Sequence, residues 1–227
     1  MPGVAKLAGA AGTNWVTDAT FINTTTSDAS VKISLWNRGG DNSNPAQRSF
    51  LLKAEQMTDV SDVLFSLFGE NAGAAALHLA VEPGIIVDGR TYNLVKEGTY
   101  GQYIPGLGEG SAVTAHRKGY LVMPVQNTGF RSNLGLVNPS DQPVDVQVKL
   151  FNAAGIQVGV DHSWNLDPRE VKQIDRIMKQ FTSQNMDAGW LEVSVKASTP
   201  DGKVQIFNSV IDMESGDPIF ETITLGL

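Results

Sequence analysis

Residues 15–37 read WVTDATFINTTTSDASVKISLWN, and residues 130–152 read FRSNLGLVNPSDQPVDVQVKLFN. The two stretches align without a gap at an offset of 115 residues, because position 15 corresponds to position 130 and position 37 to position 152. Chemistry is kept at matched positions, where Trp15 corresponds to Phe130 and Asp18 to Asn133. The chain is therefore an internal duplication, and its period is about the size of one small domain.

The second half of each copy alternates apolar and polar side chains. Val31, Ile33 and Leu35 alternate with polar neighbours in the first copy, and residues 144–150 do so in the second. Such a period of two is typical of a half-buried strand. Runs rich in Ser, Thr, Asp and Pro precede both stretches and favour turns. Each copy is therefore predicted to contain a pair of antiparallel strands with one solvent-exposed face.

Further strands are predicted near the end of each copy. Residues 75–81 and 85–92 flank the turn signal Glu-Pro-Gly, and residues 189–196 and 204–212 flank Thr-Pro-Asp-Gly. Only 18% of the residues are charged, and the chain holds 23 glycines, a composition that suits short strands and many turns. We predict an all-β fold of two tandem immunoglobulin-like β-sandwich domains, although the strand order does not follow from the sequence.

The hydrophobic period changes once in each copy. Residues 61–69, SDVLFSLFG, place Val63, Leu64, Leu67 and Phe68 on one helical face and end at a capping glycine. Residues 175–181, DRIMKQF, repeat the pattern. Helices this short do not persist alone in water. We therefore predict one short capping helix per domain, at 61–68 and 174–181, that closes an end of the sandwich.

The duplication sets the expected domain boundaries. Residues 1–104 form the first repeat and residues 119–227 the second. Residues 105–118 contain Gly106, Gly108 and Gly110 without hydrophobic periodicity, so this segment is predicted to be a Gly-rich linker.

Composition argues against several classes of partner. The 17 basic residues are scattered and the net charge is −7, so no basic patch for nucleic acid is visible. No run of 18 apolar residues occurs, and we expect no membrane insertion. The absence of cysteine excludes a disulfide scaffold, a thiolate metal site and a cysteine nucleophile.

No residue pattern identifies a reaction or a cofactor. His78, His116 and His162 lack ligand-spaced neighbours and do not recur between the copies, so ordinary surface histidines are the favoured interpretation over a metal site. The acidic residues of 212–217 lack the spacing of a calcium loop. The GLGEG stretch at 106–110 precedes no predicted helix, and no G-x-S-x-G motif occurs. We predict a protein without cofactor or metal that is not an enzyme.

Aromatic residues offer the clearest candidates for contacts. Trp15, Trp36, Phe130 and Phe151 correspond between the copies and are predicted to fill the two cores. Tyr100 and Tyr103, in a Gly-rich strand, could instead stack on sugar rings or fill a groove on a neighbouring molecule. Burial of these two tyrosines against the domain interface is the open alternative.

The C-terminal segment is a second candidate. Residues 218–225 alternate apolar and polar side chains up to the end of the chain, so Ile219, Phe220 and Ile223 are predicted to contact a partner when this strand pairs with another sheet. Exchange of a terminal strand between subunits could propagate a filament. Alternatively, both terminal strands pair within their own domains.

Three motifs together resemble a tandem β-sandwich module of large secreted proteins of environmental bacteria. They are GTNW-x-TD-x-x-FIN, SDVLFSLFG and the ending RTYN with GTYGQYIP. The residues that carry the resemblance are Gly12, Trp15, Thr17, Asp18, Asn23, Asp62, Gly69, Tyr92, Gly98, Tyr100, Gly101 and Pro105. The resemblance implies an extracellular or cell-surface location and supplies no catalytic residue. The N-terminal residues lack the pattern of a signal peptide, so an export signal is expected to be absent from this chain.

The favoured hypothesis is a non-catalytic extracellular structural or adhesion module, or a subunit of a surface filament or layer. Its expected partners are further copies of itself or other cell-surface proteins. A carbohydrate-binding module, with glycans as partners, is the alternative. A hydrolase with a cleft between the domains is less favoured.

Overall fold

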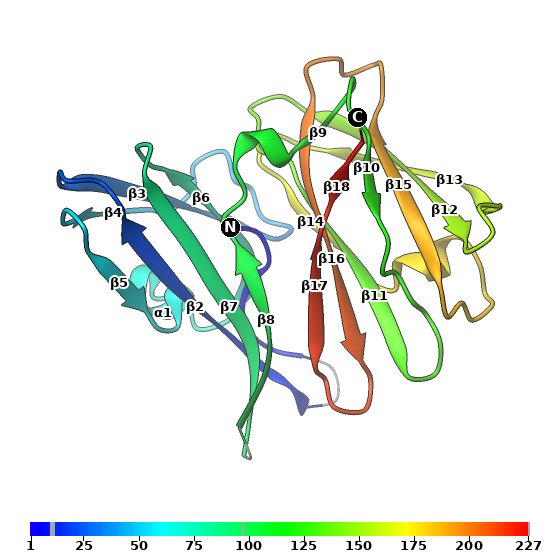
Figure 1. Ribbon diagram of the computed structural model, residues 1–227, viewed down its shortest axis with the longest axis horizontal. Coiled ribbons are helices and arrows are strands. Elements are labelled where there is room, and N and C mark those ends of the chain that lie inside the picture. Colours follow the sequence, from blue (N-terminus) through cyan, green and yellow to red (C-terminus); the bar gives the residue numbers. More distant parts are fainter. Residues whose placement is uncertain (10–11, 97, 227) are drawn as a thin grey trace. The chain divides into compact units, whose positions relative to one another are not determined.

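A computed structural model describes residues 1–9, 12–96 and 98–226. Strands hold 56% of the residues and helices 6%, which confirms the all-β, sandwich-like fold. The chain divides into two compact units, Met1–Leu107 and Gly108–Leu227 (Figure 1).

Within its described residues, the first unit contains eight strands. They are β1 (Val4–Ala8), β2 (Asn14–Asn23), β3 (Ala29–Asn37), β4 (Gln47–Leu52), β5 (Met57–Val60), β6 (Gly73–Ala80), β7 (Ile85–Val95) and β8 (Gly98–Pro105). One layer has the order β4-β3-β6-β1, and in the other β2 lies between β5 and β7, with β8 beyond β7. Strand β1 also pairs with β2, which joins both layers into one continuous sheet.

The core of the first unit lies between these layers. Val31, Ile33 and Leu35 of β3 are buried, as the alternation in the sequence indicates. Phe21 of β2 is also fully buried and meets Phe50 of β4 edge to face, with ring centroids 5.1 Å apart. The two layers are therefore packed by side chains of strands that are distant in the sequence.

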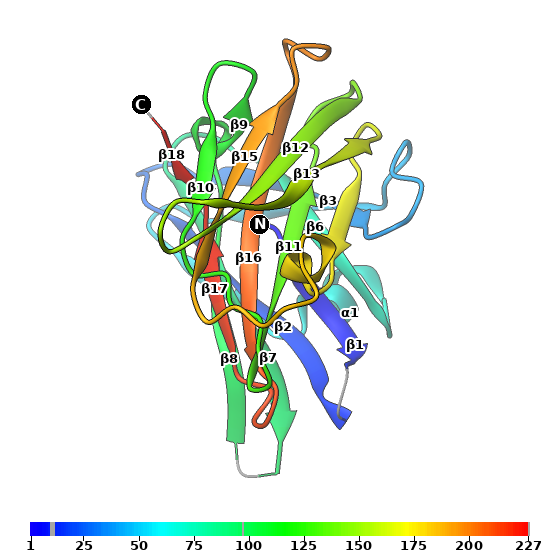
Figure 2. The same ribbon diagram turned by 90° about the vertical axis from the view of Figure 1, so that its right-hand side faces the viewer.

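The second unit repeats the strand order of the two layers, but as two separate sheets. Its strands are β9 (Val113–Thr114), β10 (Gly119–Leu121), β11 (Phe130–Val137), β12 (Val144–Asn152), β13 (Gln157–Leu166), β14 (Val171–Ile174), β15 (Gly189–Val195), β16 (Lys203–Asp212), β17 (Pro218–Thr222) and β18 (Thr224–Leu225). One sheet has the order β13-β12-β15-β10-β18 and the other β14-β11-β16-β17, with β9 paired to β16 (Figure 1 and Figure 2). A continuous core of Val, Leu and Ile side chains from both sheets lies between them.

The strand pairing shows the duplication directly. In the first unit β2 pairs with β5 and β7, and in the second the corresponding β11 pairs with β14 and β16. The first residue pair between β2 and β7 is Trp15 with Asn93, and the first pair between β11 and β16 is Phe130 with Asp212. The two copies therefore share their strand order, which the sequence alone did not provide.

The two predicted helices differ in kind. Helix α1 (Val63–Phe68) begins at Asp62, whose carboxylate accepts from the Phe65 N–H, and ends at Gly69 with φ 73°. The second copy forms only a 3₁₀ helix, Ile177–Gln180. There Arg176 stands at the N-cap without a side-chain capping bond, and Phe181 stands where the first copy has glycine. Without a capping carboxylate and a left-handed glycine, the second segment forms the shorter, tighter helix.

One aromatic core prediction is wrong. Trp36 is only 4% exposed, and Trp15 and Phe151 are half-buried, whereas Phe130 is 40% exposed. Phe130 is the first residue of β11 and faces Asp212, the last residue of β16. Its ring therefore lies at the end of the sheet, beyond the packed part of the sandwich.

The segment predicted as a linker holds regular structure. Glu109–Ser111 form a 3₁₀ helix, and β9 pairs with β16. Ala112 and Val113 are fully buried, Val113 within the hydrophobic core of the second unit. Residues from Gly108 onward thus belong to the fold of that unit.

Among the described residues, no helix is long and apolar enough to cross a membrane.

Candidate interaction surface

The hairpin of β7 and β8 forms one edge of the first unit (Figure 1). The two strands pair antiparallel from Asp88 opposite Pro105 to Val95 opposite Gly98, with no register shift. Gly98 has φ 145°, which favours glycine at the start of β8. Strand β8 is the last strand of its sheet, so one of its two edges faces away from β7.

The hydrogen-bond pattern identifies the groups on that open edge. The Gly106 N–H donates to the Val87 carbonyl at 2.9 Å, which makes these two residues a hydrogen-bonded pair. In an antiparallel ladder such pairs alternate with pairs that do not exchange bonds. The backbone N–H groups of Thr99, Gly101 and Tyr103 therefore point away from β7, whereas those between them point toward it.

Strand β8 has no charged side chain to blunt its edge, and its single proline, Pro105, stands at its C-terminal end. The sequence of residues 98–105, GTYGQYIP, contains no charged residue. Among the described edge strands of four or more residues, the other five each carry at least one charge. These charges include Arg48 in β4, Asp59 in β5, Asp161 in β13, Lys172 in β14 and Glu221 in β17. Charges on edge strands oppose pairing with another chain, so β8 is the edge best suited to accept one.

Polar and aromatic side chains cover the outer face of this hairpin. The Arg90 guanidinium lies 5.1 Å from the centre of the Tyr92 ring and donates to the Thr99 hydroxyl at 2.8 Å. A Cβ atom on Gly101 would come within 2.5 Å of the Tyr92 Cβ atom. Glycine is therefore required beneath the Tyr92 side chain, and the middle of the edge has no side chain of its own.

Tyr103 is held by a carboxylate on the same hairpin. Its hydrogen bond to Asp88, together with partial burial and the negative charge, raises the pKa of Tyr103 to about 12. Burial and the neighbouring Asp18 also raise the pKa of Tyr92. Both phenols are therefore protonated near neutral pH and can donate hydrogen bonds.

The two predicted tyrosines do not act together. Tyr100 is 41% exposed and Tyr103 is 59% exposed, and both lie on β8. They are three residues apart, and side chains alternate along a strand, so they point to opposite faces of the sheet. Tyr100 and Tyr103 thus do not form the flat aromatic row that would favour sugar stacking.

The three C-terminal candidates have different environments. Ile219 is 50% exposed, and Phe220 is half-buried and stacks on Phe207 at 4.9 Å. Ile223 is 9% exposed and belongs to the core, because the chain crosses there from β17 in one sheet to β18 in the other. Both β17 and β18 pair within the second unit, and β1 pairs within the first.

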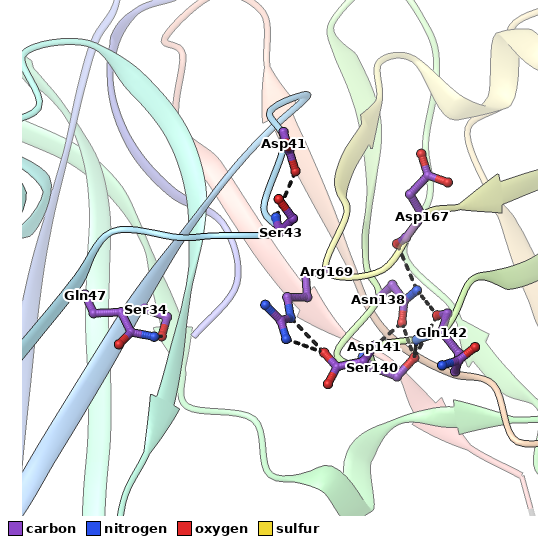
Figure 3. Close-up of polar contacts among 10 residues, drawn as sticks. All are labelled: Ser34, Asp41, Ser43, Gln47, Asn138, Ser140, Asp141, Gln142, Asp167 and Arg169. Atoms are coloured by element: carbon purple, nitrogen blue, oxygen red, sulfur yellow. Dashed lines mark hydrogen bonds and ion pairs between the residues drawn. The ribbon is translucent and has the colours of Figure 1, made fainter.

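Several polar clusters are explained by turns. The buried Asn138 amide donates to the Gln142 and Asp167 carbonyls at 2.7 and 2.9 Å, and its oxygen accepts from Ser140 (Figure 3). Arg169 forms an ion pair with Asp141 at 2.6 Å. In the first unit, shown in the same figure, Gln47 bonds Ser34 and the Ser43 N–H donates to Asp41. These contacts hold loops and strands within their own units.

The histidines have separate environments. His78 stacks on Trp36 at 4.5 Å, His162 meets Phe181 edge to face at 4.8 Å, and His116 is exposed. His162 lies in β13. Within the described residues, no group of three or more His, Asp or Glu side chains could hold a metal ion.

Sequence reasoning missed most of the β8 surface. The sequence indicated Tyr103 as a candidate contact residue and left its burial open, and it did not single out Asp88, Arg90 or Thr99. These residues lie close together only because the register of the hairpin places them side by side. The RTYN and GTYGQYIP motifs, which contain this hairpin's central residues, were the available signal.

Comparison of the sequence with protein-family models finds no match, and comparison with curated proteins finds no significantly similar protein.

Proposed function

We propose that this chain is a non-catalytic structural or adhesion module of the bacterial surface that associates with other molecules through the open edge of β8. The supporting observation is an eight-residue edge strand in unbroken register with β7 and without a charged side chain. An added strand would take up the outward N–H and C=O groups and extend the sheet.

The expected contact is weak for a single copy. Each backbone hydrogen bond contributes about 0.5–1.5 kcal/mol net, because water is displaced from both groups. The edge offers three outward N–H groups, at Thr99, Gly101 and Tyr103. Attachment of many copies to one surface would strengthen such a contact through effective concentration. A weak, repeated contact suits the tandem surface modules that the sequence resembles.

Sedimentation velocity over a concentration series tests the proposal. Tyr103→Pro removes one outward N–H group, and it leaves the ladder to β7 intact because that N–H does not face β7. Tyr103→Thr is the matched control, since it also removes the aromatic ring but keeps the N–H group. We expect concentration-dependent association of the unmodified chain, retained by Tyr103→Thr and reduced at least tenfold by Tyr103→Pro.

Thermal unfolding of both variants accompanies this measurement and establishes that both are folded. An unmodified chain that stays monomeric at millimolar concentration contradicts self-association through this edge. So does a folded Tyr103→Pro variant that associates like the unmodified chain.

A further inference from the structure

We infer that the strand added to β8 is β8 of a second copy of this chain, antiparallel and centred on Gly101. This inference rests on the proposed function and names the partner and the register. It differs from the exchange of terminal strands, because β1, β17 and β18 are already paired within their own units.

The open edge is symmetric about Gly101. Its outward N–H groups belong to Thr99, Gly101 and Tyr103, which lie at equal spacing. A twofold axis at Gly101 places Thr99 of one copy opposite Tyr103 of the other, and both glycines opposite each other. Three N–H groups on each copy then meet three carbonyl groups on the other, as the alternation of an antiparallel ladder requires. The next outward position is Pro105, which has no N–H group and ends the pairing.

Charge also favours a second copy with this orientation. On each hairpin, Arg90 reaches the Thr99 end of the open edge, and Asp88 binds Tyr103 at the other end. The antiparallel arrangement brings the Thr99 end of one copy beside the Tyr103 end of the other. The cationic end of each copy therefore meets the anionic end of its partner, so this contact occurs twice in the pair, whereas a parallel arrangement would bring like ends together.

The centre of the contact is free of side chains. Both strands have glycine at the twofold position, and Tyr92 covers Gly101 from the outer face of its own sheet. Each copy carries a net charge of −7, but β8 contains no charged residue, so like charges do not lie opposite each other across the new ladder. The twofold arrangement is closed, so this contact forms pairs, and a filament would require a second, different contact.

Disulfide trapping tests this register, because the chain has no cysteine of its own. Thr99→Cys and Tyr103→Cys are prepared as separate proteins, each with both units intact, and are oxidised alone and as a mixture. Opposite residues in a hydrogen-bonded pair have Cα atoms about 5.5 Å apart, within the range that a disulfide spans. Two copies of the same variant would hold their cysteines about 13 Å apart, at about 3.3 Å per residue.

We expect the mixture to give a disulfide dimer of one chain of each variant, at least tenfold more abundant than dimers of either variant alone. Equal trapping of each variant alone overturns the antiparallel register. Absence of trapping in the mixture, while Tyr103→Pro still reduces association, overturns the inference but leaves the proposed function standing. Absence of trapping together with no effect of Tyr103→Pro overturns both.

A charge series gives an independent check on the register. Thr99→Lys combined with Tyr103→Lys places two lysines opposite each other at both ends of the ladder and is expected to abolish pairing. Thr99→Glu combined with Tyr103→Lys places opposite charges together and is expected to restore pairing at least tenfold relative to the lysine pair. Equal pairing of the two double variants contradicts the register.

Discussion

At the scale of single residues, the duplication is clearest in two buried asparagines. Asn23 donates to the Ser27 and Leu52 carbonyls at 2.8 and 3.2 Å, and Asn138 repeats this pattern in the second copy. In each copy the amide oxygen also accepts from the backbone two residues later. A side chain that both donates and accepts thus closes the same turn twice, which explains why asparagine stands at both matched positions.

Asn138→Ala should lower the free energy of unfolding by about 2–3 kcal/mol, because buried carbonyl groups lose their donors. Asn138→Asp should lower the free energy of unfolding more at neutral pH than at pH 4. The carboxylate would face carbonyl oxygens, which raises its pKa in the folded state, so stability falls as pH rises above the unfolded pKa of about 3.9. Urea unfolding at both pH values measures this. The exposed Asn44→Ala is the control, and an equal effect of Asn44→Ala would refute the structural role.

The pairing of Tyr103 with Asp88 gives a second prediction. The phenol, with a pKa of about 12, should stay mostly protonated at pH 11. Asp88→Asn removes the charged acceptor, and we expect the Tyr103 pKa to fall toward the usual value of about 10. NMR titration of the tyrosine Cζ resonances measures this shift. A Tyr103 pKa that does not change on Asp88→Asn would show that the two side chains are not bonded.

Residue roles were partly predictable from the sequence. The matched aromatics indicated shared core positions, and Trp36 is buried as expected. Phe130 is exposed instead. The match between the copies shows that Phe130 belongs to a strand, but it does not show where along that strand the packed core ends. Ile223 was predicted to contact a partner and lies in the core, since alternation does not reveal that the chain changes sheets at that residue.

At the scale of elements, the caps decide the difference between the two helical segments. Both segments are anchored by the same matched position. The Asp62 N–H donates to the Asp18 carboxylate at 2.8 Å, and the Arg176 N–H donates to the Asn133 amide oxygen at 3.0 Å. Only the first segment adds a capping carboxylate and Gly69, and only the first segment is α-helical.

Gly69→Ala tests the importance of the C-terminal cap. The Gly69 N–H donates to the Phe65 carbonyl at 2.8 Å with φ 73°, a conformation in which a Cβ atom is unfavourable. We expect a loss of about 1 kcal/mol in the free energy of unfolding. Gly73→Ala, in an extended strand with open space around its Cα atom, is the control. A Gly69→Ala variant as stable as the unmodified chain would contradict the capping account.

The edge strands show the limit of sequence reasoning about elements. The sequence placed strands at both chain ends and in the Gly-rich GTYGQYIP stretch, but it did not show which of them has an open side. That property depends on which strands lie on either side in the sheet, and this order arises from contacts between residues far apart in the chain. The two-residue strand β9 was missed for the same reason, because its pairing with β16 leaves no periodic pattern in the sequence.

At the scale of the whole molecule, two copies of one strand order carry different edges. Strand β8 of the first unit and β17 of the second occupy the same place in their sheets, beside β7 and β16. Strand β17 has five residues, begins with Pro218 and carries the buried Glu221, whose carboxylate accepts from the Val122 and Met123 N–H groups. Its counterpart β8 has eight residues and no charge. Duplication thus leaves one copy with a blunted edge and the other with an edge suited to pairing.

Amide hydrogen exchange at low and high protein concentration tests whether the β8 edge is open in the monomer and paired in concentrated protein. We expect the Thr99, Gly101 and Tyr103 amides to exchange rapidly in dilute protein and to become protected as concentration rises. The Tyr100, Gln102 and Ile104 amides, which face β7, should be protected at both concentrations. Rapid exchange of Thr99, Gly101 and Tyr103 at every concentration, or protection of these three amides already in the dilute monomer, would show that this edge does not pair with another chain.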